Sequence, residues 1–448
     1  MIWFSTIISP SINPSFLIVK YILLLICCLN SAVPFFAQSS FQLGKASFDS
    51  IAKVLENYYV FPDKANEMSI YLKQNAASYD TFKNGNNLAE QLTLDLRKIC
   101  KDQHLKIIFE ESGTVEKSEP AGAPNSRSSW LRSLLTENNF GVKEKSILPG
   151  NIGYLNIPMF GPLNLCADTL IAAMKYVAST DALILDLRNS RGSLDENAVP
   201  FLSSYFFAEP IHMFDFYTRH NQTTRQFWTY AVVPGPLYLN KPVYILTSGR
   251  TFSGGEELAY DLQQLKRAKI IGETTRGGAN PTDLIRADAN FSVSVPVSRV
   301  INSVTGTNWE QVGVKPDVAV KSNMALYTAQ ELLLDSFLKT PTTGIEHKKI
   351  LQQLLADHRS NKPVLRTIEF DLPGYPDAKE VYLSGSFNNW APRTTSMKRT
   401  ARGWAVAIEA SPGELTYKFV VDGKFILDPS NQQVKTENGK ENSLILVK

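Results

Sequence analysis

A serine stands between an apolar run and a helical stretch, in the segment Leu246-Thr-Ser-Gly-Arg-Thr-Phe-Ser253-Gly-Gly-Glu-Glu-Leu. The unpaired backbone N–H groups at the start of a helix can stabilise an oxyanion beside a nucleophile. A second turn, Arg188-Asn-Ser-Arg-Gly192-Ser193, follows the apolar run Ala182–Leu187. Ligand sites of open α/β sheets gather at the carboxyl ends of the strands, where both segments would lie. The pattern predicts a nucleophilic serine; the alternative is a serine that only caps the helix.

The elements that would position these residues alternate between strands and helices. We expect strands at 152–157, 182–187, 243–246 and 269–271, and helices at 165–177, 197–205, 255–264, 328–338 and 345–356. This rhythm predicts a largely parallel sheet with crossover helices. The apolar run 182–187 is typical of a strand that is covered on both faces.

The sequence patterns before and after this predicted α/β core differ from those within it. Residues from Phe41 to about Phe109 have helical periodicity, and residues after Pro363 read as short strands with turns. A polar stretch rich in Pro, Gly and Ser follows residue 111. We therefore predict a signal peptide at 1–37, a helical N-terminal subdomain at 41–111, a linker at 112–129, the core at 130–338, a closing helix and linker at 339–363, and a β-sandwich at 364–448.

The N-terminal segment predicts export to the periplasm or the extracellular space. Lys20 precedes the short apolar run Tyr21–Leu29, and the small residue Ala37 precedes the polar Gln38. The run is too short to span a bilayer comfortably, and Ile26 before Cys27 does not fit a lipid-attachment motif, so we expect no stable membrane anchor after cleavage. Signal removal would leave Cys100 and Cys166, which could form one disulfide or remain two buried thiols.

Composition excludes some classes of partner. The net charge is +3 and the basic residues are scattered, so a nucleic acid is not expected as a partner. Two cysteines do not make a zinc site, and we expect neither a metal ion nor a cofactor.

Several segments resemble, in the same order, the tail-specific (C-terminal-processing) serine proteases. They are Gly153-Tyr-Leu, Leu183-Ile-Leu-Asp-Leu-Arg-Asn-Ser-Arg-Gly, Thr251-Phe-Ser-Gly-Gly-Glu-Glu, Lys266-Arg-Ala-Lys-Ile-Ile-Gly-Glu-Thr-Thr-Arg-Gly-Gly and Asn308-Trp-Glu-Gln-Val-Gly-Val-Lys-Pro-Asp317. The chain has no room for an inserted PDZ module, which makes the tricorn-core and interphotoreceptor-retinoid-binding-protein branch the closer one. The resemblance covers about Phe41 to Leu338. It implies a crotonase-like α/β core and hydrolysis of a protein or peptide substrate.

The resemblance also implies roles for individual residues. Ser253 falls at the family's nucleophile, and the backbone N–H groups of Gly254 and of the Gly192-Ser193 turn fall at its oxyanion donors. Glu310 falls at the glutamate that supports the base in the tricorn-like branch; the alternative for Glu310 is a surface carboxylate beside Trp309.

The general base is where this chain departs from its relatives. Gly278 stands where tail-specific proteases have their lysine, and Asn156 and Asn280 stand where related branches have histidine. None of these side chains takes up a proton near pH 7. His104, in Asp102-Gln-His, is the remaining candidate, with activity rising through roughly pH 6 to 7; the alternative is a histidine that braces the helical part. Without a base, the domain would be a degenerate relative that binds a peptide or an apolar ligand.

The C-terminal part resembles the glycogen-binding domain of the AMP-activated kinase β subunit. The segments Val381-Tyr-Leu-Ser-Gly-Ser-Phe-Asn-Asn-Trp390, Gly413-Glu-Leu-Thr-Tyr-Lys-Phe-Val-Val-Asp-Gly-Lys-Phe425 and Asp428-Pro-Ser carry this resemblance. It implies an immunoglobulin-like (E-set) all-β sandwich and α-glucan as a partner. The sugar-binding set would be Trp390, Lys418, Phe425 and Asn442, with phenylalanine in place of a second tryptophan. The alternative is a silent spacer, or a glycan-tethered scaffold with a vestigial peptidase domain.

Overall fold

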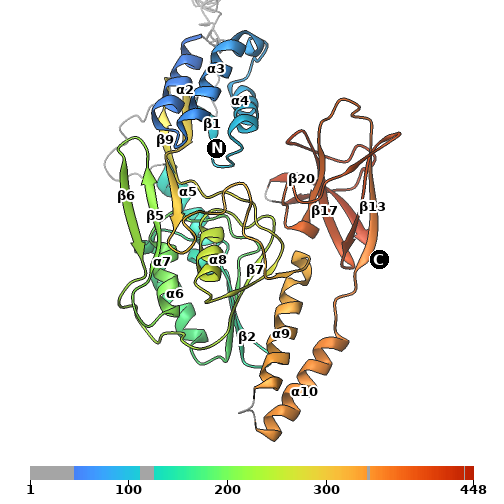
Figure 1. Cartoon of the computed structure of the whole chain (residues 1–448). Coiled ribbons are helices and arrows are strands. Elements are labelled where there is room, and N and C mark those ends of the chain that lie inside the picture. Colours follow the sequence, from blue (N-terminus) through green and yellow to red (C-terminus); the bar gives the residue numbers. More distant parts are fainter. Residues whose placement is uncertain (1–44, 111–125, 341–343, 438) are drawn as a thin grey trace, which may run out of the picture. The chain divides into compact units, whose positions relative to one another are not determined.

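The computed structural model describes residues 45–110, 126–340, 344–437 and 439–448 of the chain (Figure 1). The predicted signal peptide and most of the predicted linker lie outside these residues. Within the described ranges, no helix has the length and apolar character needed to cross a membrane.

The core is built on a six-stranded sheet that brings the carboxyl ends of its parallel strands together. The strand order is β12-β8-β7-β4-β3-β2. Only β2 runs antiparallel to its neighbour. The strands are β2 (Glu144–Leu148), β3 (Ile152–Asn156), β4 (Ala182–Asp186), β7 (Val243–Thr247), β8 (Lys269–Gly272) and β12 (Val318–Ala319). The predicted parallel sheet is confirmed.

Helices cover both faces of this sheet, which explains the apolar run at β4. Leu183 and Leu185 pack on one side with α6 (Leu163–Val177), α7 (Ala198–Ser203) and α8 (Gly254–Gln264). The alternate residues Ala182 and Ile184 pack on the other side with α9 (Ala325–Lys339) and α10 (Ile345–Ser360). Side chains of successive strand residues point to opposite faces, so a doubly covered strand needs apolar residues throughout.

The N-terminal part begins with three helices and ends in a strand. The helices are α2 (Lys45–Tyr58), α3 (Pro62–Asn75) and α4 (Gly85–Cys100), and α4 ends at Lys101, which adopts a left-handed conformation. The prediction of helical structure up to Phe109 was wrong, because β1 (Lys106–Phe109) pairs with β10. That pairing fixes the loop 101–105 against the core. The predicted linker also ends too late, since α5 (Ser126–Glu137) begins inside it.

Two small antiparallel sheets complete this part and were not predicted from the sequence. One has the order β1-β10-β9 and the other β11-β5-β6. Their strands are β5 (His212–Thr218), β6 (Thr223–Trp228), β9 (Thr282–Arg286), β10 (Phe291–Pro296) and β11 (Ser298–Asn302).

The C-terminal part is a β-sandwich whose two sheets share an apolar core. One sheet has the order β13-β16-β15 and the other β14-β17-β20-β19, with β18 paired to β17. Leu372 and Ile408 from the first sheet pack with Leu383, Leu415 and Phe419 from the second. The strands are β13 (Arg366–Pro373), β14 (Val381–Gly385), β15 (Lys398–Thr400), β16 (Gly403–Ala410), β17 (Gly413–Val421), β18 (Lys424–Ile426), β19 (Val434–Glu437) and β20 (Lys440–Val447). The predicted fold class, an α/β core with N-terminal helices and an all-β sandwich, is confirmed.

Candidate active site and glycan-binding face

Ser253 occupies a strained turn between β7 and α8. Its backbone has φ 52° and ψ −124°, a conformation that L-residues rarely adopt outside functional sites. The turn is held because the N–H of Phe252 donates to Ser190 O at 3.0 Å and the N–H of Ser253 donates to Glu256 Oε2 at 2.9 Å. The Oγ of Ser253 lies 3.1 Å from His104 Nε2. Ser253 therefore stands at the cap position that precedes α8, but its hydroxyl also contacts the imidazole of His104.

The turn that follows β4 packs directly against the nucleophile turn. A Cβ at Gly192, where φ is +108°, would lie 2.7 Å from Ser253 Cβ, and a Cβ at Gly254 would lie 2.8 Å from Ser193 N. Only glycine allows this approach, which places the N–H groups of Ser193 and Gly254 side by side. In the described part of the chain neither N–H has a hydrogen-bond acceptor. Both groups can therefore donate to an oxyanion formed at Ser253.

His104 is held in place from three directions. Its ring stacks on Phe252 with centroids 4.4 Å apart. Its backbone N–H donates to Asp102 Oδ1 at 2.9 Å. The guanidinium of Arg97 donates to the carbonyls of Gln103 and Leu105 at 2.6 and 2.8 Å. Burial, with the positive charges of Arg276 and Arg97, lowers the pKa of His104 to about 3, so the imidazole is neutral near pH 7.

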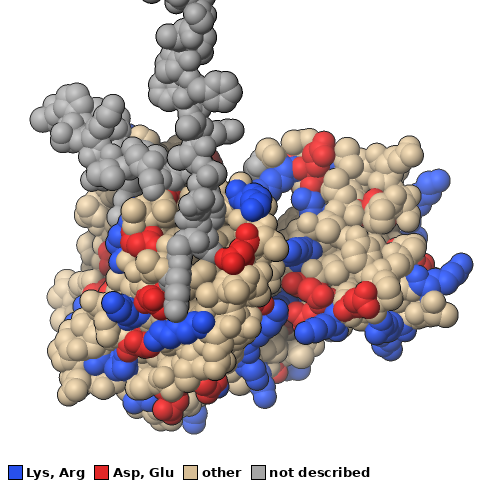
Figure 2. All heavy atoms as spheres, turned by 90° about the horizontal axis from the view of Figure 1, so that it is seen from above, with Lys and Arg blue, Asp and Glu red and all other residues tan. Residues whose placement is uncertain are grey.

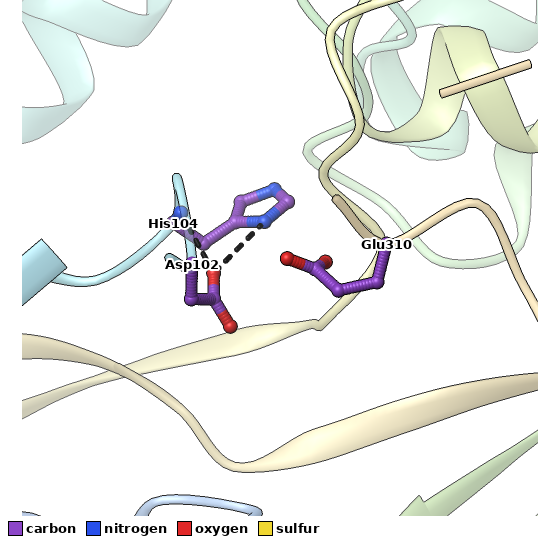
Figure 3. Close-up of side chains that lie close together, drawn as sticks. All are labelled: Asp102, His104 and Glu310. Atoms are coloured by element: carbon purple, nitrogen blue, oxygen red, sulfur yellow. Dashed lines mark hydrogen bonds and ion pairs between the residues drawn. The ribbon is translucent and has the colours of Figure 1, made fainter. Parts of the chain in front are cut away.

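Two carboxyl groups face the far edge of the imidazole (Figure 3). Asp102 Oδ1 lies 3.9 Å from His104 Nδ1, and Asp102 Oδ2 accepts from Asn280 Nδ2 at 2.8 Å. Glu310 Oε2 accepts from the N–H of Ala279 at 2.6 Å, while its Oε1 and His104 Nδ1 are buried and have no hydrogen-bond partner among the described residues. Burial and the charge of Asp102 raise the pKa of Glu310 to about 8.

The same three side chains could also ligate a cation. One ligand atom each from Asp102, His104 and Glu310 lies within 4.8 Å of the others. The second ring nitrogen of His104 contacts Ser253 Oγ, however, and a histidine between a serine and carboxylates is the arrangement of a general base with its orienting acids. The geometry therefore favours acid–base chemistry.

The positions where relatives have a different base are each occupied for a structural reason. A Cβ at Gly278 would lie 2.2 Å from Phe252 Cε2 and 3.0 Å from His104 Cε1, so a side chain there would displace the Phe252 ring on which His104 stacks. Asn280 is buried against Asp102. Asn156 ends β3, and in the described part of the chain its side chain has no hydrogen bond with Ser253 or Glu310.

Glu256 joins the nucleophile turn to the loop that follows β8. Its two oxygens accept from the N–H groups of Ser253, Gly277 and Gly278 at 2.9, 2.6 and 2.9 Å, and from Thr275 Oγ1 at 2.5 Å. The side chain is fully buried, and burial raises its pKa to about 7. A role for Glu256 was not predicted from the sequence, although the Ser-x-x-Glu spacing is that of a helix capping box.

Three of the four sugar-binding candidates of the sandwich, Lys418, Phe425 and Asn442, share one face of the second sheet. Lys418 lies on β17 with its side chain directed away from the core that Tyr417 and Phe419 enter. Phe425 of β18 pairs with Val420 and so lies on the same face as Lys418. Asn442 precedes Ser443, the partner of Tyr417, and joins this face. Trp390 follows β14, and its N–H donates to Gly385 O at 2.8 Å.

Two family models match the part of the chain that contains this site. Residues 151–320 match peptidase family S41, and residues 45–140 match the N-terminal domain of Peptidase_S41 in eukaryotic IRBP. This part of the chain is similar to peptidase family S41. The S41 part, residues 45–320, contains Ser253, His104 and Glu310. The alternative of a surface carboxylate at Glu310 was wrong, because its neighbour Trp309 is buried and Glu310 faces His104.

Solved structures share low sequence identity with the S41 part. A protein from Parabacteroides merdae described as a candidate peptidase is 18% identical with a TM-score of 0.47, covering 65% of this chain and 98% of that one. The photosystem II D1 C-terminal processing protease is 15% identical with a TM-score of 0.41, covering 62% of this chain and 94% of that one.

The sandwich matches a carbohydrate-binding family. Residues 369–448 match the glycogen recognition site of AMP-activated protein kinase. The chain is 43% identical over 70 residues to 5′-AMP-activated protein kinase subunit beta-1 of Sus scrofa and of Homo sapiens. These 70 residues are 16% of this chain and cover 56% and 25% of those two proteins, so the chain spans only part of these relatives.

The pKa values of the S41 site predict a pH profile that differs from the sequence-based expectation. Because the pKa of His104 is about 3, no loss of activity between roughly pH 7 and 6 is expected from this imidazole. Glu310 is neutral below its pKa of about 8 and ionises above it, and the ionised form stabilises an imidazolium at His104. We expect kcat/KM of the wild type to rise through about pH 8. Rate measurements on Glu310→Gln should lack this rise, whereas Glu331→Gln, on α9 and paired with Arg359, should keep it. A rise that persists in Glu310→Gln assigns it to another group.

Proposed function

We propose that the S41 part is a serine-type peptidase that cleaves a protein or peptide substrate through an acyl-enzyme at Ser253. The observation that carries this proposal is the 3.1 Å separation of Ser253 Oγ and His104 Nε2. The imidazole of His104 is neutral near pH 7 and is held in a fixed orientation. A histidine in hydrogen-bond reach of a serine, itself facing carboxyl groups, is the arrangement that activates a hydroxyl for attack on a carbonyl.

The reaction follows from the positions of these groups. Ser253 Oγ forms a bond to the substrate carbonyl carbon while its proton moves to His104 Nε2. The N–H groups of Gly254 and Ser193 donate to the resulting oxyanion, an interaction worth about 3 kcal/mol of barrier per donor in such sites. The imidazolium, stabilised by Asp102 and Glu310, gives the proton to the leaving amine as the C–N bond breaks. A water molecule, deprotonated by His104, then hydrolyses the ester.

A fluorophosphonate probe tests the reactivity of the serine. Such probes label hydroxyls that a base has activated, so the wild type should be labelled and Ser253→Ala should not. The matched control is Ser248→Ala, whose hydroxyl donates to Arg188 O and does not contact His104. Labelling of Ser253→Ala at the wild-type level, or no labelling of the folded wild type, contradicts the proposal and favours the ligand-binding alternative.

We further propose that the sandwich binds an α-glucan through Trp390, Lys418, Phe425 and Asn442. The shared face of Lys418, Phe425 and Asn442 supports this, together with the 49% exposure of Phe425. Aromatic faces stack on sugar rings, while amide and ammonium groups bind hydroxyls. Trp390 also adopts a positive φ of 59°, which a bulky residue rarely keeps without a functional reason.

Affinity electrophoresis in glycogen-containing gels tests this second activity. The wild type should be retarded, and Phe425→Ala should lose most of the retardation because the stacking face is removed. Leu446→Ala is the matched control, an exposed apolar residue near the other end of β20 from Asn442. If Phe425→Ala migrates like the wild type in the presence of glycogen, this face does not carry the binding.

The face shown in Figure 2 carries charges of both signs, which does not favour binding of a polyanion to this face. On the face shown in Figure 2, Lys and Arg side chains are interspersed with Asp and Glu side chains. Binding to nucleic acid needs a continuous basic stripe, which this face does not have.

A further inference from the structure

Arginine side chains next to the proposed catalytic pair have no carboxylate partner among the residues that the structure describes. The guanidinium Cζ of Arg276 lies 4.6 Å from the centre of the Phe252 ring, on which His104 also stacks. Nη2 of Arg276 donates to the neutral amide oxygen of Gln103, at 3.4 Å. Phe252 precedes Ser253 and Gln103 precedes His104, so Arg276 touches the neighbours of both reacting residues. Its side chain is more than a third exposed and is open to a ligand.

Two further arginines lie on the turns that form the site. Arg191 is exposed and immediately precedes Gly192, and Arg250 stands three residues before Ser253. Within the described ranges, no carboxylate forms an ion pair with Arg191, Arg250 or Arg276, whereas Arg188 pairs with Asp186 at 2.6 Å. Burial, then the charges of Arg191 and Arg276, lower the pKa of Arg250 to about 10. The three positive charges are therefore close enough to repel one another.

We propose that Arg276, together with the exposed Arg191, forms a subsite for a carboxylate of the peptide substrate beside the scissile bond. The carboxylate would be an Asp or Glu side chain or a free C-terminus, since these share the planar group that a guanidinium binds with two parallel hydrogen bonds. Stacking on Phe252 holds the planar guanidinium of Arg276 in one orientation, so the side chain loses less conformational entropy when a carboxylate binds. This inference rests on the proposed peptidase function.

A bound carboxylate would also change the base. The positive charges of Arg276 and Arg97 are among the causes that hold the pKa of His104 low. Neutralising Arg276 raises the basicity of His104 and strengthens it as an acceptor of the Ser253 proton. A substrate with a correctly placed carboxylate would therefore have a higher kcat as well as a lower KM.

Matched fluorogenic peptides that differ by one Glu-to-Gln exchange near the cleaved bond, each with a free or an amidated C-terminus, test the subsite. We expect the wild type to cleave the acidic peptide with about ten-fold higher kcat/KM than its neutral partner, and the ratio to fall as salt rises. Arg276→Gln should bring the ratio to about one. Arg225→Gln, which removes a guanidinium paired with Glu196, should leave the ratio unchanged. Preference for the Glu side chain or for the free C-terminus identifies the source of the carboxylate.

Binding to Ser253→Ala separates this inference from the peptidase proposal. Fluorescence anisotropy of the same peptides needs no turnover. Tighter binding of the acidic peptide that is lost in Ser253→Ala/Arg276→Gln supports the subsite even if the wild type cleaves nothing, in which case only the peptidase proposal fails. Equal affinity for acidic and neutral peptides, or a ratio that Arg276→Gln leaves unchanged, overturns the subsite even if cleavage occurs.

Discussion

His104→Gln is expected to lower kcat by about 10²–10⁴-fold with KM little changed, because general-base catalysis is typically worth that factor. Glutamine can still form a hydrogen bond with Ser253 Oγ, but its amide does not accept a proton near pH 7. The Ser253 proton would then have no acceptor at the position 3.1 Å away that His104 Nε2 now occupies. Steady-state kinetics on a cleaved peptide, with circular dichroism to verify folding, measure the effect.

The matched control is His358→Gln on α10. His358 stacks on Tyr327 and its Nε2 contacts Tyr327 O at 2.9 Å, so the exchange alters a histidine of similar packing outside the S41 site. Its kcat should stay at the wild-type value. If His104→Gln retained wild-type kcat, the peptidase proposal would stand with a different base, and Glu310 would be the next residue to test.

The fold was predictable where local patterns decide it. The apolar run of β4 predicts a strand covered on both faces. The strands β3, β4, β7 and β8 and the helices α6, α7, α8, α9 and α10 lie within a few residues of their predicted ranges. The strand β1 was not predictable, because its four residues are stabilised by pairing with β10, almost two hundred residues away. Local periodicity carries no information on such a pairing.

The residues of the candidate site also differ in how far the sequence predicts them. Ser253 and the Gly192-Ser193 turn come directly after strands of one parallel sheet, so sequence order alone brings them to one edge. His104 lies 149 residues before Ser253 and is held beside it by long-range contacts, among them the β1–β10 pairing and the hydrogen bond from Asn280 to Asp102. The sequence therefore left its role open, and the contact with Ser253 favours the base over a histidine that braces the helices.

The absence of the usual lysine has a steric explanation that the sequence did not contain. Phe252 and His104 fill the space beside Gly278, so a side chain at position 278 would displace the Phe252 ring on which His104 stacks. The glycine at 278 and the proposed base at position 104 are therefore compatible with the same packing.

Glu256→Gln is expected to lower the free energy of unfolding by about 3 kcal/mol or more, because each buried donor left without an acceptor costs about 1–3 kcal/mol. The carboxylate of Glu256 accepts four hydrogen bonds, from Ser253, Thr275, Gly277 and Gly278. An amide offers one oxygen and turns an NH₂ group toward the remaining donors. Denaturant unfolding followed by fluorescence measures the loss.

Activity should fall as well, because Glu256 ties the turn of Ser253 to the loop whose Gly278 borders His104. The neighbouring Glu257→Gln is the matched control. Burial and the charge of Asp261 raise the pKa of Glu257 well above its usual value. The side chain of Glu257 accepts none of the four hydrogen bonds of Glu256, so an amide at position 257 leaves these contacts in place. We expect Glu257→Gln to unfold at the wild-type denaturant concentration and to keep the wild-type kcat. Equal stability of Glu256→Gln and Glu257→Gln would show that the four hydrogen bonds of Glu256 do not hold the two halves of the site together.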